Sequence, residues 1–163
     1  CNDVSDADLD ILDRTSARVV YCPRASDYFG APARLGPHRY RDMLARSIPV
    51  ALGTDSIINL PPAAASPESG GISILDEMRH LHRRDGTDPS TLLAMATLHG
   101  AAALDMAPGL FQLAPGTSPL AILAIDVSGT LPGSNANDPR TLALLSEAPP
   151  KIVWTRKNAA TQE

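Results

Sequence analysis

The most informative segment of the chain reads Ile48-Pro49-Val50-Ala51-Leu52-Gly53-Thr54-Asp55-Ser56. Its apolar first half predicts a short buried strand, because such a run bounded by turn residues is typical of parallel sheets. Asp55 follows this strand directly, and in parallel α/β folds the carboxyl ends of the strands form the ligand sites. Asp55 is therefore a candidate for binding a metal or accepting a proton. The alternative is that it merely caps the next turn.

The residues before this segment alternate between helix and strand patterns. A helix capped by Ser5 is expected to run to about Thr15, and residues 18–22 form a β-branched run that predicts a buried strand ended by Pro23. Residues 27–37, rich in Gly, Ala and Pro, are predicted to be a loop. A second helix is expected from Pro37 or His38 to about Arg46. This order points to parallel strands joined by crossover helices.

The residues after Asp55 predict a long loop and then a helical stretch. Residues 57–71 are full of Pro, Ala, Ser and Gly, and loops of this length are often lids or binding loops. Apolar residues at helical spacing predict a helix from Ile74 to about Arg84, and Asp88 or Ser90 caps another. Gly100 is expected to interrupt that helix, with a further short helix over residues 101–106.

The last third of the chain has a different character. Three apolar runs, separated by loops with Gly and Pro, predict strands over residues 120–127, 141–145 and 152–155. We therefore divide the chain into an α/β part, residues 1–108, and a part with β-sandwich strands, residues 109–163.

The composition excludes several classes of protein. The net charge is −4 and Lys and Arg are scattered, which argues against a nucleic-acid-binding surface. No apolar run approaches the roughly 18 residues of a membrane span, and no signal-peptide pattern opens the chain. Its two cysteines, Cys1 and Cys22, make no disulfide framework. We expect a cytoplasmic protein without a membrane or nucleic-acid partner.

Five segments together resemble the amidohydrolase superfamily, in its branch of aromatic deaminases and triazine chlorohydrolases. Residues 50–56 are similar to the last barrel strand of that branch, and residues 19–26 to the preceding strand with its Cys-Pro-Arg-Ser turn. Residues 93–104 resemble the helix motif after the barrel. Residues 113–116, followed by residues 122–126, resemble the return to the β-sandwich, and residues 152–156 resemble its last strand. The order and spacing of the five carry the resemblance.

The resemblance implies an α/β fold, namely the C-terminal portion of a (β/α)₈ TIM-like barrel, strands seven and eight with their helices, plus part of a small β-sandwich. It assigns Asp55 as a metal ligand and as the catalytic proton acceptor. The divalent metal, zinc or alternatively iron, would lower the pKa of a water to about 7. The family's other ligands, His residues and a Glu, would lie before Cys1. The isolated chain is therefore expected to be inactive and to need its missing N-terminal part.

The resemblance also offers substrate-binding residues. Arg24 and Ser26 follow strand seven, although Arg24 is equally explained as a salt-bridge partner or a solvated loop residue. His38 either approaches the site or starts a helix, and Ser56 either touches substrate or holds the metal ligand. The pair His80 and His82 is rejected as a metal-binding pair, because residues two apart on a helix point to nearly opposite sides.

The function implied is hydrolysis in the complete protein. The expected reaction is deamination of an amino-substituted heterocycle such as a purine, pyrimidine or pterin, and displacement of chloride or an alkylamine from a triazine is possible within the same class. The partners expected are the small-molecule substrate and, in the complete protein, further copies of the chain. The alternative is a non-catalytic α/β module or half-protein that binds a complementary chain.

Overall fold

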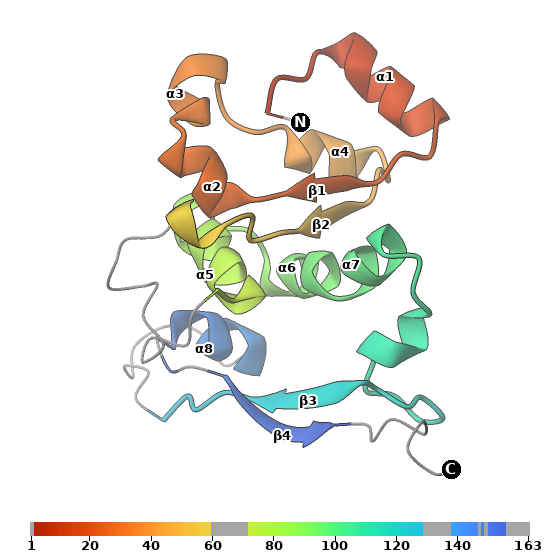
Figure 1. The fold of residues 1–163 in the computed structure, drawn as a ribbon, viewed down its shortest axis with the longest axis vertical. Helices are drawn as coiled ribbons and strands as arrows, with labels where there is room; N and C mark the ends of the chain where they lie inside the picture. Colours follow the sequence, from red (N-terminus) through yellow and green to blue (C-terminus); the bar gives the residue numbers. More distant parts are fainter. Residues whose placement is uncertain (1, 60–71, 129–137, 147, 149, 156–163) are drawn as a thin grey trace.

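The parallel strand pair that the sequence predicts is present. The computed structural model describes residues 2–59, 72–128, 138–146, 148 and 150–155. Strand β1 (Val19–Tyr21) pairs in parallel with β2 (Val50–Leu52), with Val19 opposite Val50 and Tyr21 opposite Leu52. All three residues of β2 are buried, as its uninterrupted apolar sequence predicts. Helices lie on both sides of this sheet (Figure 1).

The first helices follow partly from the sequence. Helix α1 (Asp6–Arg14) is capped by Ser5, whose side chain accepts from the Asp8 N–H while the Asp8 carboxylate accepts from the Ser5 N–H. Helix α4 (Tyr40–Ala45) begins two to three residues later than predicted.

The prediction of a loop over residues 27–37 is wrong. Helix α2 (Pro23–Tyr28) runs into this segment and α3 (Ala31–Leu35) lies inside it. Both helices have proline in the first turn, where the missing N–H costs nothing and the fixed φ favours the helix. Gly36 ends α3 with a φ of 80°, so the prolines and glycines here delimit short helices rather than a loop.

After β2 the described residues form the 3₁₀ turn η1 (Ile57–Asn59), α5 (Ile74–Asp85), α6 (Pro89–Ala96), α7 (Leu98–Ala103) and the 3₁₀ helix η4 (Pro108–Phe111). Helices α5 and α6 agree with the prediction, whereas η1 lies inside the loop predicted for residues 57–71 and α7 begins before the short helix predicted for residues 101–106. Ser73 caps α5 and Asp88 caps α6. The break between α6 and α7 falls at Thr97 and not at Gly100, which lies inside α7. Residues 60–71 of the predicted loop lie outside the described residues.

The C-terminal region contains a helix where a strand was predicted. Strands β3 (Ala121–Ala124) and β4 (Lys151–Thr155) pair antiparallel, but residues 141–145 belong to helix α8 (Pro139–Leu145). The side chain of Asp138 accepts from the Arg140 N–H, and Pro139 is the first residue of the helix. The apolar run is too short for its periodicity to distinguish a helix from a strand, so the N-terminal cap determines that it is helical. The described residues of this region therefore show one antiparallel pair and one helix.

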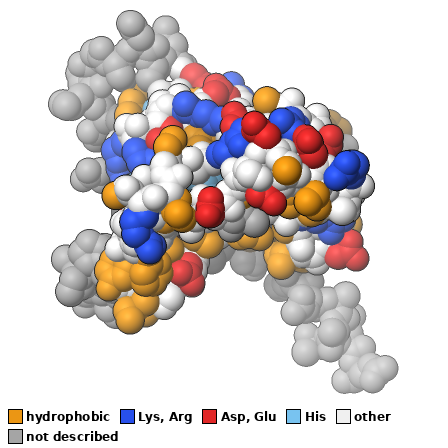
Figure 2. Space-filling model, turned by 90° about the horizontal axis from the view of Figure 1, so that it is seen from above, with side chains coloured by type: hydrophobic (Ala, Val, Ile, Leu, Met, Phe, Trp, Pro, Cys, Tyr) orange, Lys and Arg blue, Asp and Glu red, His pale blue; other side chains and the backbone are white. Residues whose placement is uncertain are grey.

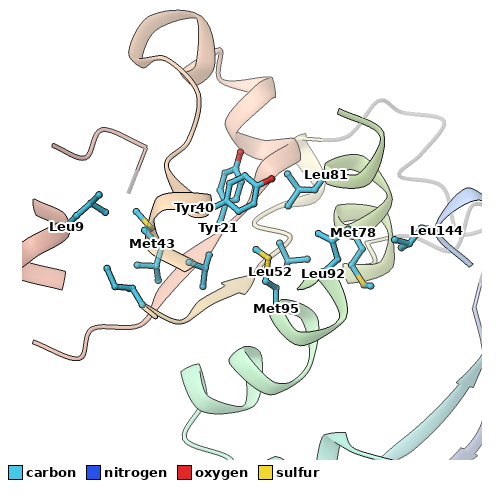
Figure 3. Packing of buried hydrophobic residues seen from close by; sticks show 13 residues of the cluster. Leu9, Tyr21, Tyr40, Met43, Leu52, Met78, Leu81, Leu92, Met95 and Leu144 are labelled. Atoms are coloured by element: carbon cyan, nitrogen blue, oxygen red, sulfur yellow. The ribbon is translucent and has the colours of Figure 1, made fainter. Parts of the chain in front are cut away.

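One apolar core joins the two regions. It packs β1 and β2 against α1 and α4 on one side and α5 and α6 on the other, with residues such as Met43, Leu81, Leu92 and Met95 fully buried (Figure 3). Leu144 of α8 is also part of this cluster. The core thus holds the parallel sheet firmly and reaches the C-terminal region through α8.

Charges of both signs alternate on the face over α1 and α4. Arg39 binds Asp6 at 2.7 Å and Arg46 binds Asp10 at 2.6 Å, which ties α4 to α1. Basic and acidic side chains are interspersed on the face that Figure 2 shows. Among the described residues, no helix combines the length and apolar character that crossing a membrane requires.

Candidate functional site

The site lies where the two parallel strands end. Cys22 directly follows β1, and Gly53 to Asp55 follow β2. The Gly53 N–H donates to the Tyr21 carbonyl at 2.9 Å, which extends the pairing beyond the strands. A Cβ on Gly53 would lie 2.7 Å from Val20 Cγ1 and 2.9 Å from Cys22 Sγ. Only glycine therefore allows this close approach, which places Asp55 beside the end of β1.

Asp55 has an unusual backbone conformation. Its φ is 57°, in the left-handed region that few residues other than glycine adopt. Its carboxylate Oδ2 accepts from the side-chain amide of Asn59, a buried residue of η1, at 2.9 Å. The next turn is capped instead by Ser56, whose Oγ accepts from the Ile58 N–H. The geometry therefore assigns turn capping to Ser56 and leaves the carboxylate of Asp55 oriented by Asn59.

Three of the predicted site residues line one cavity. Its volume is about 220 Å³, and Asp55, Ser26 and His38 contribute to its wall together with Cys22 and residues of α2 and β1. The Ser26 hydroxyl is buried and donates to Asn2 Oδ1 at 3.0 Å. The structure thus brings together side chains from the ends of both strands and from the segment before α4.

His38 is a neutral base held in place by an aromatic ring. Its imidazole stacks on Tyr21 with 3.7 Å between ring centroids, and the residue is 8% exposed. Burial lowers the pKa of His38 to about 4, and the positive charge of Arg84 acts in the same direction. Its Nδ1 has no hydrogen-bond partner among the described residues. His38 lines the cavity and does not start α4, whose N-cap is Arg39.

Cys22 is a free, half-buried thiol in the cavity wall. Burial raises the pKa of Cys22, and the negative charges of Asp55 and Glu77 raise it further. Because the thiolate is the nucleophilic form, Cys22 is poorly suited to covalent catalysis at neutral pH. It serves as a wall of the cavity.

Arg24 does not line this cavity, because it pairs with a buried carboxylate. Its backbone N–H and its Nε donate to the two oxygens of Glu77, at 3.1 and 2.5 Å. Burial raises the pKa of Glu77, and Arg24 opposes that shift. Glu77 is not among the residues predicted from the sequence. The available signal was its place on the inward face of α5, where a carboxylate in an apolar stripe needs a partner.

The described residues do not form a complete metal site. They contain no group of three or more His, Cys, Asp or Glu side chains able to hold an ion. His80 and His82 lie on α5, as their helical pattern predicts, and contact Asp27 and the Thr87 carbonyl, at 2.5 and 2.9 Å. Asp55 fits one oxygen ligand, and a zinc site needs three or four ligands.

Comparison with known proteins places this chain in a family. No curated protein and no solved structure matches it. A family model described as "Amidohydrolase family" matches residues 3–131, which include β1, β2, Asp55 and the lining residues of the cavity other than Asn2. The match supports a metal-dependent hydrolase in general. Since it covers most of the sequence, the chain belongs to the amidohydrolase family.

Proposed function

We propose that this chain is the C-terminal part of a metal-dependent hydrolase that deaminates an amino-substituted heterocycle. The observation that carries the proposal is the position of Asp55 in a chain of the amidohydrolase family. Asp55 follows a buried parallel strand, has a left-handed φ of 57° and lines a cavity with His38 and Ser26.

Asp55 would have two roles in this reaction. Its carboxylate suits a divalent metal as one ligand, with the remaining ligands supplied from outside the described residues. Bound zinc, or iron, would supply a water with a pKa lowered to about 7. Asp55 accepts a proton in the attack on the ring carbon and passes it to the departing amine. The amide of Asn59, 2.9 Å from Oδ2, orients the carboxylate for both roles.

The cavity wall offers polar groups that suit a heterocycle. The neutral imidazole of His38 can donate or accept a hydrogen bond to a ring nitrogen. Ser26 offers a hydroxyl at the same wall. Arg24 and Ser56 are weaker candidates for substrate contacts, because the guanidinium of Arg24 binds Glu77 and the hydroxyl of Ser56 caps η1.

The test is the metal content of the full-length protein with and without the Asp55 carboxylate. Asp55→Asn is the matched variant, since asparagine tolerates a left-handed φ and can still accept from Asn59. The wild-type protein should hold about one zinc or iron per chain, and Asp55→Asn should lose most of it. Unchanged metal content in Asp55→Asn would contradict the proposal.

The same preparations identify the leaving group. Amino-substituted purines, pyrimidines and pterins should release ammonia with the wild-type protein and not with Asp55→Asn. A chlorotriazine that releases chloride instead would keep the metal chemistry and change the substrate class. If the protein holds its metal but hydrolyses none of these compounds, deamination of heterocycles is the wrong reaction.

A second candidate function, binding of a complementary chain, is favoured by the exposure of the sheet. The described part of the chain has only two parallel strands, and Val20 in β1 is 52% exposed. Parallel sheets are normally covered on both faces, so this surface fits a partner that adds strands. The 163-residue chain alone should then aggregate, and co-expression of a complementary segment should keep it in solution. Cooperative unfolding of a stable monomer would exclude this function.

A further inference from the structure

The buried ion pair of Arg24 and Glu77 has no part in the chemistry proposed above. Glu77 is 0% exposed, and Arg24 reaches it through its backbone N–H as well as its side chain. The Nη2 of Arg24 also donates to the Ser73 carbonyl at 3.4 Å. Arg24 thus binds both the cap and the first turn of α5. Two of these hydrogen bonds involve the backbone, at Arg24 and at Ser73, so they restrain the start of α2 relative to the start of α5 more than a bond between two side chains would.

The pair joins the two chain segments that flank the site. Arg24 is the second residue of α2, two residues after Cys22 at the end of β1. Glu77 lies in the first turn of α5, the next helix longer than a single turn described after Asp55. The negative charge of Glu77 also suits the positive end of this helix.

A chain of close contacts leads from the pair to Asp55. The turn of residues 22–24 starts α2, where the Cys22 carbonyl accepts from the Ser26 N–H at 2.9 Å. Cys22 Sγ in turn lies so close to Gly53 that a Cβ there would be 2.9 Å away. A displacement of this turn would therefore move the wall against which the strand end of Asp55 packs, because Cys22 and Asp55 line the same cavity.

Stability alone does not account for such a pair. Removing two charges from water costs several kcal/mol per ion, and apolar residues of similar size are often as stabilising as a buried pair. We propose that Arg24 and Glu77 are positioning residues that hold the turn of residues 22–24, and through it Asp55, in the geometry for metal binding. This proposal rests on the proposed role of Asp55 as a ligand.

The decisive variant is the double replacement Arg24→Met and Glu77→Met in the full-length protein. It removes both charges but also takes the acceptor from the backbone N–H of residue 24, so the melting temperature should fall by less than in Glu77→Met alone, which in addition leaves the Arg24 charge unpaired. Zinc affinity, measured by competition with a chelator, should fall about 10- to 100-fold in the double variant, as for other groups that orient metal ligands. Wild-type zinc affinity in a folded double variant would overturn the proposal.

Arg79→Met is the matched control. Arg79 is a buried arginine of α5, the helix of Glu77, but it binds Asp76 and the Ala148 carbonyl instead of α2. Its replacement should lower the melting temperature and leave zinc affinity unchanged. Equal losses of zinc affinity in Arg79→Met and in the Arg24 and Glu77 variants would mean that any disturbance of α5 impairs the site, and the positioning role would be refuted.

A readout without metal separates this proposal from the role of Asp55. Cys22 is half-buried, so the alkylation rate of its fully ionised thiolate, taken from the pH dependence of alkylation in each protein and read by mass spectrometry on the peptide that contains it, reports the position of the turn and not the change in pKa that loss of the Glu77 charge causes. The double variant should be alkylated severalfold faster than the wild type, and Arg79→Met should not. If zinc binding proves independent of Asp55, this rate still shows whether the pair holds the turn. Identical rates in the wild type and the double variant would show that it does not.

Discussion

The parallel and antiparallel strand pairs of this chain differ in what surrounds them. Every residue of β2 is buried and the core cluster packs on it from several helices, whereas the described side chains of β3 and β4 are exposed or half-buried. The C-terminal region reaches the core through Leu144 of α8. The difference teaches that neighbouring helices, rather than strand pairing, stabilise a two-stranded sheet, and that the candidate site lies on the better supported of the two.

The largest expected effect separates the two regions by stability. Leu92 in α6 is 0% exposed. Replacement of Leu92 by alanine should lower the unfolding free energy of the protein by about 2–5 kcal/mol, because a cavity remains in the packed core. Leu113, 79% exposed in the C-terminal region, should change by less than about 0.5 kcal/mol on the same replacement. Urea unfolding followed by circular dichroism measures both. Similar losses would mean that the C-terminal region is as tightly packed as the core.

Acid should weaken the site region through His38. The folded pKa is about 4 and the unfolded value is 6.5, so below pH 6.5 the unfolded chain takes up a proton that the folded chain refuses. The unfolding free energy is therefore highest, as far as His38 is concerned, above pH 6.5. It decreases by up to about 3 kcal/mol as the pH falls toward 4. The measurement is the unfolding free energy at pH 7, 5.5 and 4.

His38→Gln is the control for this pH dependence. It removes the titrating group, so the unfolding free energy of the variant lacks the decrease that His38 causes in the wild type. The advantage of the wild type in unfolding free energy should therefore be smaller at pH 4 than at pH 7. The C-terminal region has no histidine at all, since the four in the chain lie before residue 109. A pH dependence that His38→Gln leaves unchanged would assign the acid sensitivity to carboxylates instead.

The close approach at Gly53 should show a smaller effect. Gly53→Ala places a Cβ 2.7 Å from Val20 Cγ1 and should cost about 1–3 kcal/mol, since the two strand ends must separate. Gly109→Ala in η4 meets nothing within 4 Å and should be neutral or slightly stabilising. Thermal unfolding of the two variants makes the comparison. No loss in Gly53→Ala would show that the strand ends can move apart freely.

The sequence predicted the parallel sheet better than the C-terminal region for a physical reason. Both strands are apolar runs ended by a residue that stops a strand, Pro23 after β1 and Gly53 after β2. The segment of α8 is equally apolar, yet its N-terminal cap at Asp138 makes it a helix. A five-residue run has no periodicity to read, and only the cap distinguishes the two structures.

The site was predictable only in part, because a sequence indicates where a residue lies along its helix or strand but not which distant residues it contacts. The place of Asp55 after a strand follows from local sequence, and so does a helical pattern over His80 and His82. The binding of Arg24 by Glu77 joins residues 53 positions apart, and the stacking of His38 on Tyr21 depends on how α4 packs. Tertiary contacts of this kind leave no local signal in one sequence.

The smallest effect expected concerns two aspartates with nearly the same backbone. Asp55 and Asp105 have φ values of 57° and 56°, so glycine should relieve a similar strain at both, by up to about 1 kcal/mol. Asp105→Gly should show this gain, since its ion pair with Arg18 spans 3.6 Å at the surface and contributes little. Asp55→Gly also loses the hydrogen bond from Asn59, worth about 1 kcal/mol, and should be close to neutral. Precise thermal melts of both variants decide this. If Asp55→Gly is strongly destabilised, the carboxylate of Asp55 stabilises the fold. If the variant is as stable as the wild type, the carboxylate adds nothing to stability, and its chemical role is the remaining reason for an aspartate at the end of β2.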